Sequence, residues 1–167
     1  DRPEVAARFL SPIKHKPAPD PFSGHDLDRV ISNVTLPLHR TVLTVALGGG
    51  LALDEACRLE SEDIDSKRML IRLDAKGSAW PKFVPLHHET LKTLREWWRD
   101  TRPQTSLIFT VESDHTPLTF GPVQKALQAA LKGSGFEQTS EESVLRYSFF
   151  LDRLRRGAHP REVMHLL

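Results

Sequence analysis

Basic side chains gather in the C-terminal third of the sequence, at Arg153, Arg155, Arg156, His159 and Arg161. Guanidinium groups suit phosphate recognition, because their planar fork donates two parallel hydrogen bonds and keeps its proton. The cluster is therefore either a surface that contacts a phosphate backbone or an ordinary solvated face. Composition does not decide between the two, since the formal net charge is only +1 and any binding surface must come from how the charge is distributed.

The rest of the composition narrows the kinds of site that the chain can hold. Its single cysteine, Cys57, can form no intrachain disulfide and cannot by itself build a zinc site, which favours a reducing, cytoplasmic setting. No apolar run approaches the length of a membrane span, so we expect no membrane partner. The chain starts with Asp1 rather than Met, and we therefore expect it to be a fragment of a longer protein.

Prolines and hydrophobic periodicity divide the chain into a linker followed by several helices. Residues 11–21 hold four prolines beside two lysines, which predicts an extended, basic linker. Helix-start residues and apolar spacing predict the helices that follow. We expect helices from Ser23 past Ile31, from Pro37 to the glycines at 48–50, after those glycines through Leu59, around Leu91 to Trp98 and ending before Pro103, from Thr119 to near Gly133, from Thr139 to about Gly157, and from Pro160 onward.

One stretch between these helices has the pattern of strands. Residues 69–73 and 83–86 are apolar and β-branched runs, and residues 74–78 between them have turn composition, which predicts a hairpin with a long tip. The short apolar run at 107–109 is not assigned to either type. The order of elements predicts a mostly α domain with a small β-sheet or hairpin, an α+β fold.

Three segments combine polar residues with these elements in a recognisable order. The first is 50–59, Gly-Leu-Ala-Leu-Asp-Glu-Ala-Cys-Arg-Leu, followed by the acidic turn at 63–65. The second joins Lys-Gly at 76–77 to Lys-Phe-Val-Pro-Leu-His at 82–87. The third is Ser-Val-Leu-Arg-Tyr-Ser-Phe at 143–149, continuing to the end of the chain.

These segments resemble the catalytic domain of the tyrosine recombinases of the phage integrase family. They are similar to the family's G-L-R-x-x-E stretch, to its hairpin lysine with a basic residue ahead of V-P-L, and to its H-x-L-R block. The resemblance covers residues 21–167 and implies the fold of the DNA breaking-rejoining enzymes, truncated here before the nucleophile segment. Residues 1–20 would then be the end of a preceding domain and the proline-rich basic linker.

The resemblance also implies a reaction. In this family a tyrosine hydroxyl attacks a DNA phosphodiester and a second DNA end later reverses the step, without metal, ATP or another cofactor. Two arginines neutralise the negative charge of the phosphorane-like transition state, a lysine protonates the leaving oxygen, and imidazoles help to transfer protons. Double-stranded DNA is the implied partner, bound by a homo-oligomer.

Three residues of this chain match catalytic positions of the family. Arg146 matches the second arginine, although a surface arginine paired with Glu141 or Glu142 is the alternative. Lys76 matches the leaving-group lysine, although any solvated lysine could lie at a hairpin tip. Glu55 matches the acid that supports the arginines, although a carboxylate is also favoured at a helix start by the helix dipole.

Other positions depart from the family pattern. Ala52 stands where the first arginine belongs, and its nearest neighbours on one helix face are Glu55 and Ala56, with Arg58 rotated away. Ser143 stands where the family usually has histidine, and a hydroxyl cannot buffer a proton at neutral pH.

The nucleophile is missing as well. Tyr147 is the only tyrosine and lies beside Arg146, whereas the attacking tyrosine of the family comes well after that arginine, beyond Leu167 here. We expect Tyr147 to be a packing residue, and Trp97 and Trp98 to be core and rim residues rather than stacking platforms.

The sequence thus predicts a phage-integrase-like site-specific recombinase domain that binds DNA and is catalytically impaired in this chain. A non-catalytic DNA-binding module or a protein-interaction module on the same fold is the alternative. The residues expected to contact DNA are Arg146, Lys76, Lys82, Arg153, Arg155 and Arg156.

Overall fold

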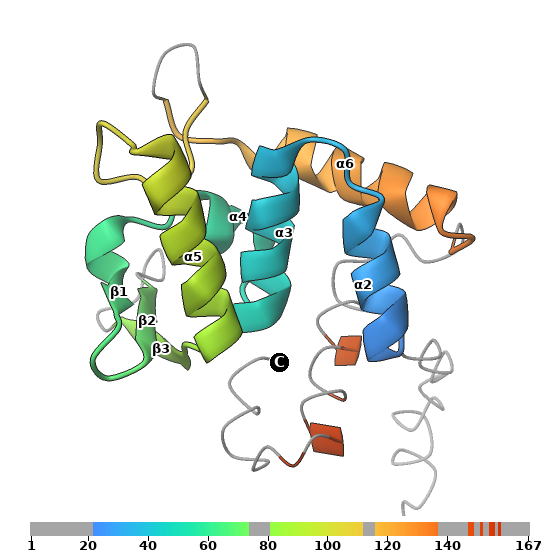
Figure 1. Ribbon diagram of the computed structural model, residues 1–167, viewed down its shortest axis with the longest axis horizontal. Coiled ribbons are helices and arrows are strands. Elements are labelled where there is room, and N and C mark those ends of the chain that lie inside the picture. The colour runs from blue at the N-terminus through green and yellow to red at the C-terminus, as the bar shows by residue number, and fades with distance from the viewer. Residues whose placement is uncertain are drawn as a thin grey trace, which may run out of the picture.

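The computed structural model describes residues 22–73, 81–111, 116–136, 147–148, 151, 154–155 and 157. The linker predicted at 11–21, the hairpin tip at 74–78 and the helix starts at Thr139 and Pro160 lie outside these residues. Figure 1 shows the described helices gathered around one another, with a small sheet at one side. The fold is mostly helical with a small antiparallel sheet, which confirms the predicted fold class.

The described elements follow one another in the predicted order. They are α2 (Gly24–Ser32), α3 (Pro37–Gly49), α4 (Leu53–Cys57), the 3₁₀ turn η1 (Ser61–Asp63), β1 (Ile64–Asp65), β2 (Leu70–Leu73), β3 (Lys82–Pro85), α5 (His88–Thr101) and α6 (Phe120–Gly133). Near the C-terminus, Tyr147, Ser148, Leu151, Leu154 and Arg155 are helical. The helix predicted after the glycines is shorter than expected, because α4 ends at Cys57 and does not reach Leu59.

The start of α2 shows how local chemistry fixes a helix end. The backbone N–H of Asp26 donates to the Ser23 hydroxyl at 3.2 Å, and the Ser23 N–H donates back to the Asp26 carboxylate at 3.0 Å. This capping box satisfies two backbone donors that a helix start would otherwise leave without partners. The Ser23 hydroxyl and backbone N–H together hold the pKa of Asp26 below its ordinary value.

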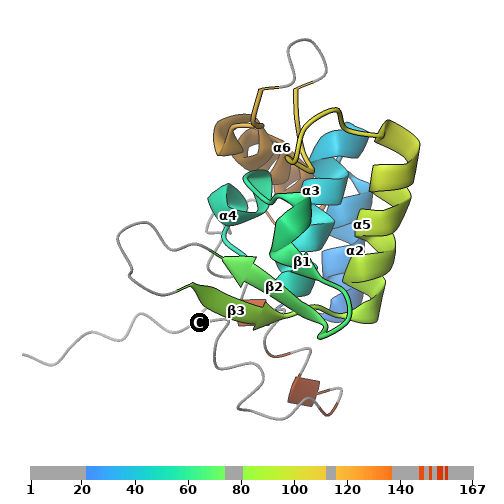
Figure 2. The same ribbon diagram turned by 90° about the vertical axis from the view of Figure 1, so that its left-hand side faces the viewer.

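The sheet has three antiparallel strands in the order β1–β2–β3, which Figure 2 shows beside the helices. Ile71 pairs with Val84 across β2 and β3, and both side chains are fully buried. Alternation then turns Phe83 to the other face, where 52% of it is exposed. The hairpin prediction is confirmed; β1 was not predicted, because two residues are too few to show a period.

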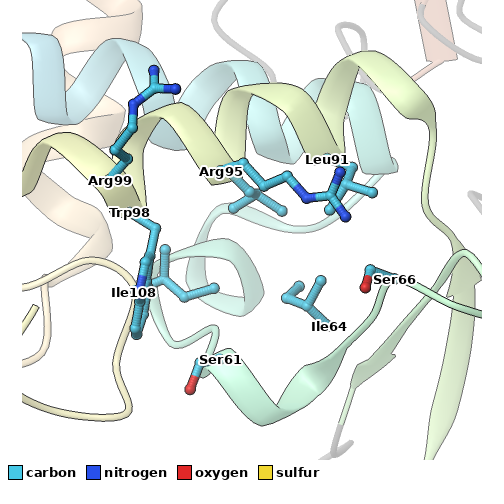
Figure 3. A pocket seen from close by; sticks show the side chains of 9 residues that line it. Ser61, Ile64, Ser66, Leu91, Arg95, Trp98, Arg99 and Ile108 are labelled. Carbon is cyan, nitrogen blue, oxygen red and sulfur yellow. The ribbon is translucent and has the colours of Figure 1, made fainter. Parts of the chain in front are cut away.

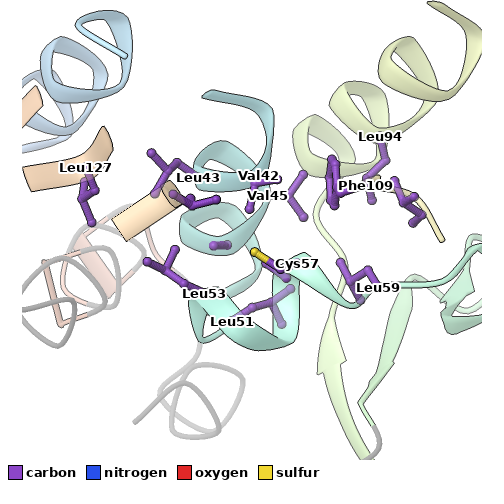
Figure 4. Close-up of a cluster of buried hydrophobic side chains, with 14 of the residues drawn as sticks. Val42, Leu43, Val45, Leu51, Leu53, Cys57, Leu59, Leu94, Phe109 and Leu127 are labelled. Atoms are coloured by element: carbon purple, nitrogen blue, oxygen red, sulfur yellow. The ribbon is translucent and has the colours of Figure 1, made fainter. Parts of the chain in front are cut away.

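The core forms around α3, which packs against α2, α4, α5 and α6. Figure 4 shows side chains of α3, α4 and α5 meeting in this cluster, among them Val42, Leu53 and Leu94. At Gly48 a Cβ would collide with the Thr90 hydroxyl, so α3 and α5 approach closely because this position carries no side chain.

The run at 107–109, which the sequence leaves unassigned, forms an isolated bridge between Leu107 and Glu60. Phe109, the last residue of the run, is fully buried and lies against Trp97 with the ring centroids 6.0 Å apart. The run is therefore an irregular connection, with bends at Ile108 and Phe109, and these two buried residues belong to the core.

A buried hydrogen bond joins the beginning of the described chain to its end. The Phe22 N–H donates to the Ser148 hydroxyl at 2.9 Å across a separation of 126 positions, and the Ser148 side chain is fully buried. The third motif segment is therefore fastened to the rest of the core at Ser148. None of the helices in the described ranges is long and apolar enough to cross a lipid bilayer.

Candidate functional site

The first motif segment forms the corner between α3 and α4. Gly50 ends α3 in the left-handed conformation, with φ of 64°, and the Leu51 N–H donates back to the Ala46 carbonyl at 2.8 Å. A residue with a Cβ would be strained at this φ, which explains the glycine. Leu51 and Leu53 are each 3% exposed, so the side chains on either side of position 52 anchor the corner in the core.

Ala52 lies between these two anchors, at the N-cap of α4, and is partly exposed. Its backbone N–H donates to Oε2 of Glu55 at 2.7 Å. Glu55 therefore caps the start of α4, in agreement with the helix-start interpretation, and its role as a supporting acid stays a prediction. The methyl group of Ala52 offers no donor to a ligand at this corner.

Neighbouring arginines are engaged elsewhere. Arg58 lies 3.9 Å from the Asp54 carboxylate on the same helix, in keeping with the expectation that it is rotated away from position 52. Arg72 of β2 lies 3.2 Å from the Asp63 carboxylate, whose other oxygen accepts the Glu60 N–H at 3.0 Å. The acidic turn of the motif thus has a local structural explanation, as a helix cap and an ion-pair partner.

Of the two lysines predicted in the hairpin, the structure describes Lys82 and leaves Lys76 outside its range. Lys82 begins β3, pairs across the sheet with Leu73 and is exposed. The exposed Phe83 follows it, a residue to which the sequence patterns give no role. Residues 83–86 are apolar at every position, although one face of a two-layered strand is usually polar. That departure is the signal that could have drawn attention to Phe83.

The third motif segment is described in part. Arg146, Arg153, Arg156 and Ser143 fall outside the described residues, and Arg155 is exposed. Tyr147 is half-buried beside the buried Ser148, as a packing residue would be. Within the part of the chain that the structure describes, no hydrogen bond or ion pair joins Glu55, Lys82 and Arg155.

The two tryptophans of α5 divide as predicted. The Trp97 indole N–H donates to the Ile108 carbonyl at 3.0 Å, and its ring packs against the core. Trp98 is 37% exposed and lines a surface cavity with Ile108. No group of three His, Cys, Asp or Glu side chains in the described ranges could hold a metal ion.

Solved structures of tyrosine recombinases share this arrangement of helices and sheet. The XerA recombinase matches with a TM-score of 0.73 over 94% of this chain and 57% of that one, at 19% sequence identity. The catalytic core of lambda integrase matches with a TM-score of 0.67 over 88% of this chain and 90% of that one, at 16% identity. The fold is that of a tyrosine recombinase catalytic domain.

The sequence itself places the protein more narrowly. The profile of the phage integrase family matches residues 26–167, and the chain belongs to that family. A protein named "Putative integrase/recombinase y4qK", from Sinorhizobium fredii, is 30% identical over 169 residues, which cover 100% of this chain and 54% of that protein. Tyrosine recombinase XerC of Proteus mirabilis is 30% identical over 131 residues, covering 77% of this chain and 42% of that protein. The chain spans about half the length of these curated relatives.

Proposed function

We propose that this chain is the catalytic-domain portion of a site-specific DNA recombinase, that it binds double-stranded DNA, and that it cannot cleave DNA by itself. The observation that carries the proposal is the α3–α4 corner. It carries the segment that resembles the family motif on a left-handed Gly50, two buried leucines and the capping Glu55, with Ala52 where the resemblance places an arginine. Residues 21–167 would form this domain, and residues 1–20 the end of a preceding domain and its linker.

Proteins of this fold supply the reason to expect DNA and an oligomer. The XerH recombinase has been solved bound to its difH substrate, and lambda integrase as a tetramer on a Holliday junction. Lys82 and Arg155 are exposed in this chain and would meet the phosphate backbone together with Lys76, Arg146, Arg153 and Arg156. No metal or other cofactor takes part in this proposal.

The missing arginine sets the expected size of the catalytic defect. Loss of one preorganised donor to a transition-state oxyanion costs about 3–4 kcal/mol, or roughly 100- to 1000-fold in rate. A bidentate cation at position 52 would contribute at least that much. Arg58 is the C-cap residue of α4 and Ala52 its N-cap, so Arg58 lies at the other end of the helix and does not replace the missing arginine.

DNA binding is tested first, by the anisotropy of a labelled duplex titrated with the chain at several salt concentrations. Phosphate contacts predict an affinity that falls steeply as salt rises. Lys82→Glu and Arg155→Glu should each weaken binding and reduce the salt dependence, whereas Lys132→Glu, an exposed change on α6, should have little effect. An affinity that does not change with salt would count against DNA binding.

Cleavage is tested in the full-length protein with a nicked suicide substrate, which traps a covalent protein–DNA adduct. We expect no adduct from the 167-residue chain. In the full-length protein, Ala52→Arg combined with Ser143→His should raise the yield of adduct by about the factor lost with one oxyanion donor, 100-fold or more. An adduct formed by the unaltered chain would contradict the proposed role of Ala52.

A further inference from the structure

A surface cavity separates α5 from the segment that contains η1 and β1 (Figure 3). Its volume is about 250 Å³. Leu91 and Leu94 of α5, Ile64 of β1 and Ile108 form the apolar part of its lining, and the Trp98 ring stands at its edge. The lining thus combines aliphatic side chains with an aromatic ring on one face of the molecule.

Two arginines border this cavity on the side of α5. Arg95 and Arg99 are four positions apart on α5, and in Figure 3 the Arg95 side chain runs toward Leu91 above the cavity while that of Arg99 turns away from Ile64 and Ser61. Among the described residues no carboxylate lies within ion-pair distance of Arg95. Arg99 lies 3.5 Å from Asp100, but both side chains are about 70% exposed, and such a pair contributes little. The α5 side of the cavity is therefore positively charged.

The core contacts of Trp97 explain why this position carries a tryptophan, but no such contacts explain Trp98. Trp97 packs against Phe109 and donates to a backbone carbonyl. Trp98 is 37% exposed and lies beside Arg95 and Arg99. Exposed aromatic and arginine side chains around an apolar depression are the residues most often found at the energetic centre of protein interfaces.

The opposite side of the cavity is lined by uncharged residues, and the two aspartates between them are paired, Asp63 with Arg72 and Asp65 with Arg68. Ser61 and Ser66 line it there, and their hydroxyls can bond to a peptide backbone. Glu62, which follows Ser61, is not among the lining residues. A ligand lying in the cavity therefore meets cations on one side, hydroxyls on the other and aliphatic carbon beneath it.

We propose that this cavity is the docking site for an acidic, apolar peptide segment of a partner protein, a role beyond the DNA-recombining function proposed above. Drug-sized ligands occupy cavities of roughly 300–1,000 Å³, so this one suits one or two large side chains of a peptide better than a whole cofactor. The aliphatic floor takes the apolar side chains, and Arg95 with Arg99 takes carboxylates at neighbouring positions of the peptide. A nucleic-acid backbone would meet the arginines but has no aliphatic side chain to fill the floor.

The test uses a fluorescein-labelled peptide of twelve residues with Leu and Phe on one helical face and Asp and Glu on the other. Its anisotropy, measured against the complete chain, should give a dissociation constant on the order of 10 μM, a transient interaction. Arg95→Glu/Arg99→Glu and Trp98→Ala should each weaken binding by about tenfold or more, because they reverse the attraction and remove the ring. Lys92→Glu is the matched control, since this exposed residue of α5 does not line the cavity, and it should change binding less than about twofold.

Matched peptides separate the two parts of the interaction. Replacing Asp and Glu by Asn and Gln, or Leu and Phe by Ser, should each abolish measurable binding. The proposal is overturned if the amide peptide binds as well as the acidic one, if Arg95→Glu/Arg99→Glu leaves binding unchanged, or if no binding is seen at millimolar peptide. It is also overturned if sedimentation shows that the same substitutions dissociate a homodimer, or if they weaken DNA binding as much as Lys82→Glu does. Retained DNA binding by the Arg95→Glu/Arg99→Glu protein separates this result from the fate of the proposed DNA-binding function.

Discussion

The α3–α4 corner and the outer face of α5 differ in whether folding explains the residues that they carry. At the corner, Gly50, Leu51, Leu53 and Glu55 each have a role in folding: a left-handed helix end, two buried anchors and a cap. On α5, Arg95, Trp98 and Arg99 at the edge of the cavity are exposed, and no comparable folding role explains these three. The corner is where the family places a phosphate-binding cation, and Ala52 there has none.

This difference separates the architecture of a site from its chemistry. Because Leu51 and Leu53, which hold the corner, are buried in the core, we expect the corner to keep its shape with an arginine at position 52. The structural residues of the motif therefore indicate the family, but they do not indicate whether the protein carries out the reaction. The outer face of α5 differs from the corner in the opposite way: it has side chains of the kind that bind ligands, on a helix that is not part of the family motifs.

The largest effect is expected from removing a corner anchor. Leu53→Ala deletes a side chain that is 3% exposed, and should lower the free energy of unfolding by about 2–5 kcal/mol, because it leaves a cavity in the core. Trp98→Ala, on the α5 face, should lower it by less than about 1 kcal/mol, since the ring is already partly solvated. Urea unfolding followed by circular dichroism measures both. Equal losses would remove the distinction between the two regions.

Two helices end at a residue in the left-handed conformation, and substitutions at these two residues should change the stability of the protein in opposite directions. Gly50 ends α3 with φ of 64°, and Gly50→Ala should cost about 1–2 kcal/mol because a Cβ is strained there. Arg102 ends α5 with φ of 45° and is exposed, so Arg102→Gly should stabilise the protein by about 0.5–1 kcal/mol. Thermal unfolding should show the melting temperature moving down for the first and up for the second. A loss of stability in Arg102→Gly would mean that its side chain contributes contacts that outweigh the strain.

Most of the fold could be predicted because its signals are local. Ser23 with Asp26, the proline at 37 and the glycines at 48–50 mark helix ends by their own chemistry, and the structure has the ends there. What could not be predicted depends on contacts between distant residues. The two-residue strand β1 exists only because Ile64 pairs with Ile71, and the buried bond from Phe22 to Ser148 spans nearly the whole chain.

The site could be predicted less fully, for a physical reason. A family motif fixes where a side chain is attached, but its partner in space decides what the side chain does. The contact of Glu55 with the Ala52 N–H gives this residue a part in folding that the motif alone does not show, while its role as a supporting acid stays a prediction. The cavity beside α5 brings together Ile64, Leu91 and Ile108, and no period or spacing in the sequence connects those three positions.

The hydrogen bond of Glu55 can be tested directly. Glu55→Ala removes the acceptor for the Ala52 N–H and should lower the free energy of unfolding by about 1 kcal/mol. Glu55→Gln keeps an acceptor oxygen on a side chain of the same length, so a smaller loss is expected. Chemical denaturation of the two variants beside the unaltered chain distinguishes them. If neither variant loses stability, Glu55 has no capping role, and its presence in the motif needs another explanation.

The smallest effect concerns the beginning of α3, at the opposite end of that helix from the corner. Burial holds the pKa of His39 below its ordinary value of 6.5, and its Nδ1 is buried with no hydrogen-bond partner among the described residues. The unfolded chain, in which the imidazole is solvated, therefore binds a proton more readily than the folded one. It follows that the folded state is fully stable above about pH 6.5 and loses stability as the pH falls through the lower, folded pKa.

His39→Gln isolates this contribution, because the carboxylates that also titrate in acid are common to both proteins. The urea midpoint is measured at about pH 7.5 and at about pH 5 for each protein. The difference between these two midpoints should be smaller for the variant than for the unaltered chain, since glutamine takes up no proton. The glutamine amide fills a similar volume, so the comparison is between pH slopes rather than absolute stabilities. Parallel slopes for the two proteins would mean that His39 accepts its proton without penalty in the folded state, and that the beginning of α3 opens to water more easily than its burial indicates.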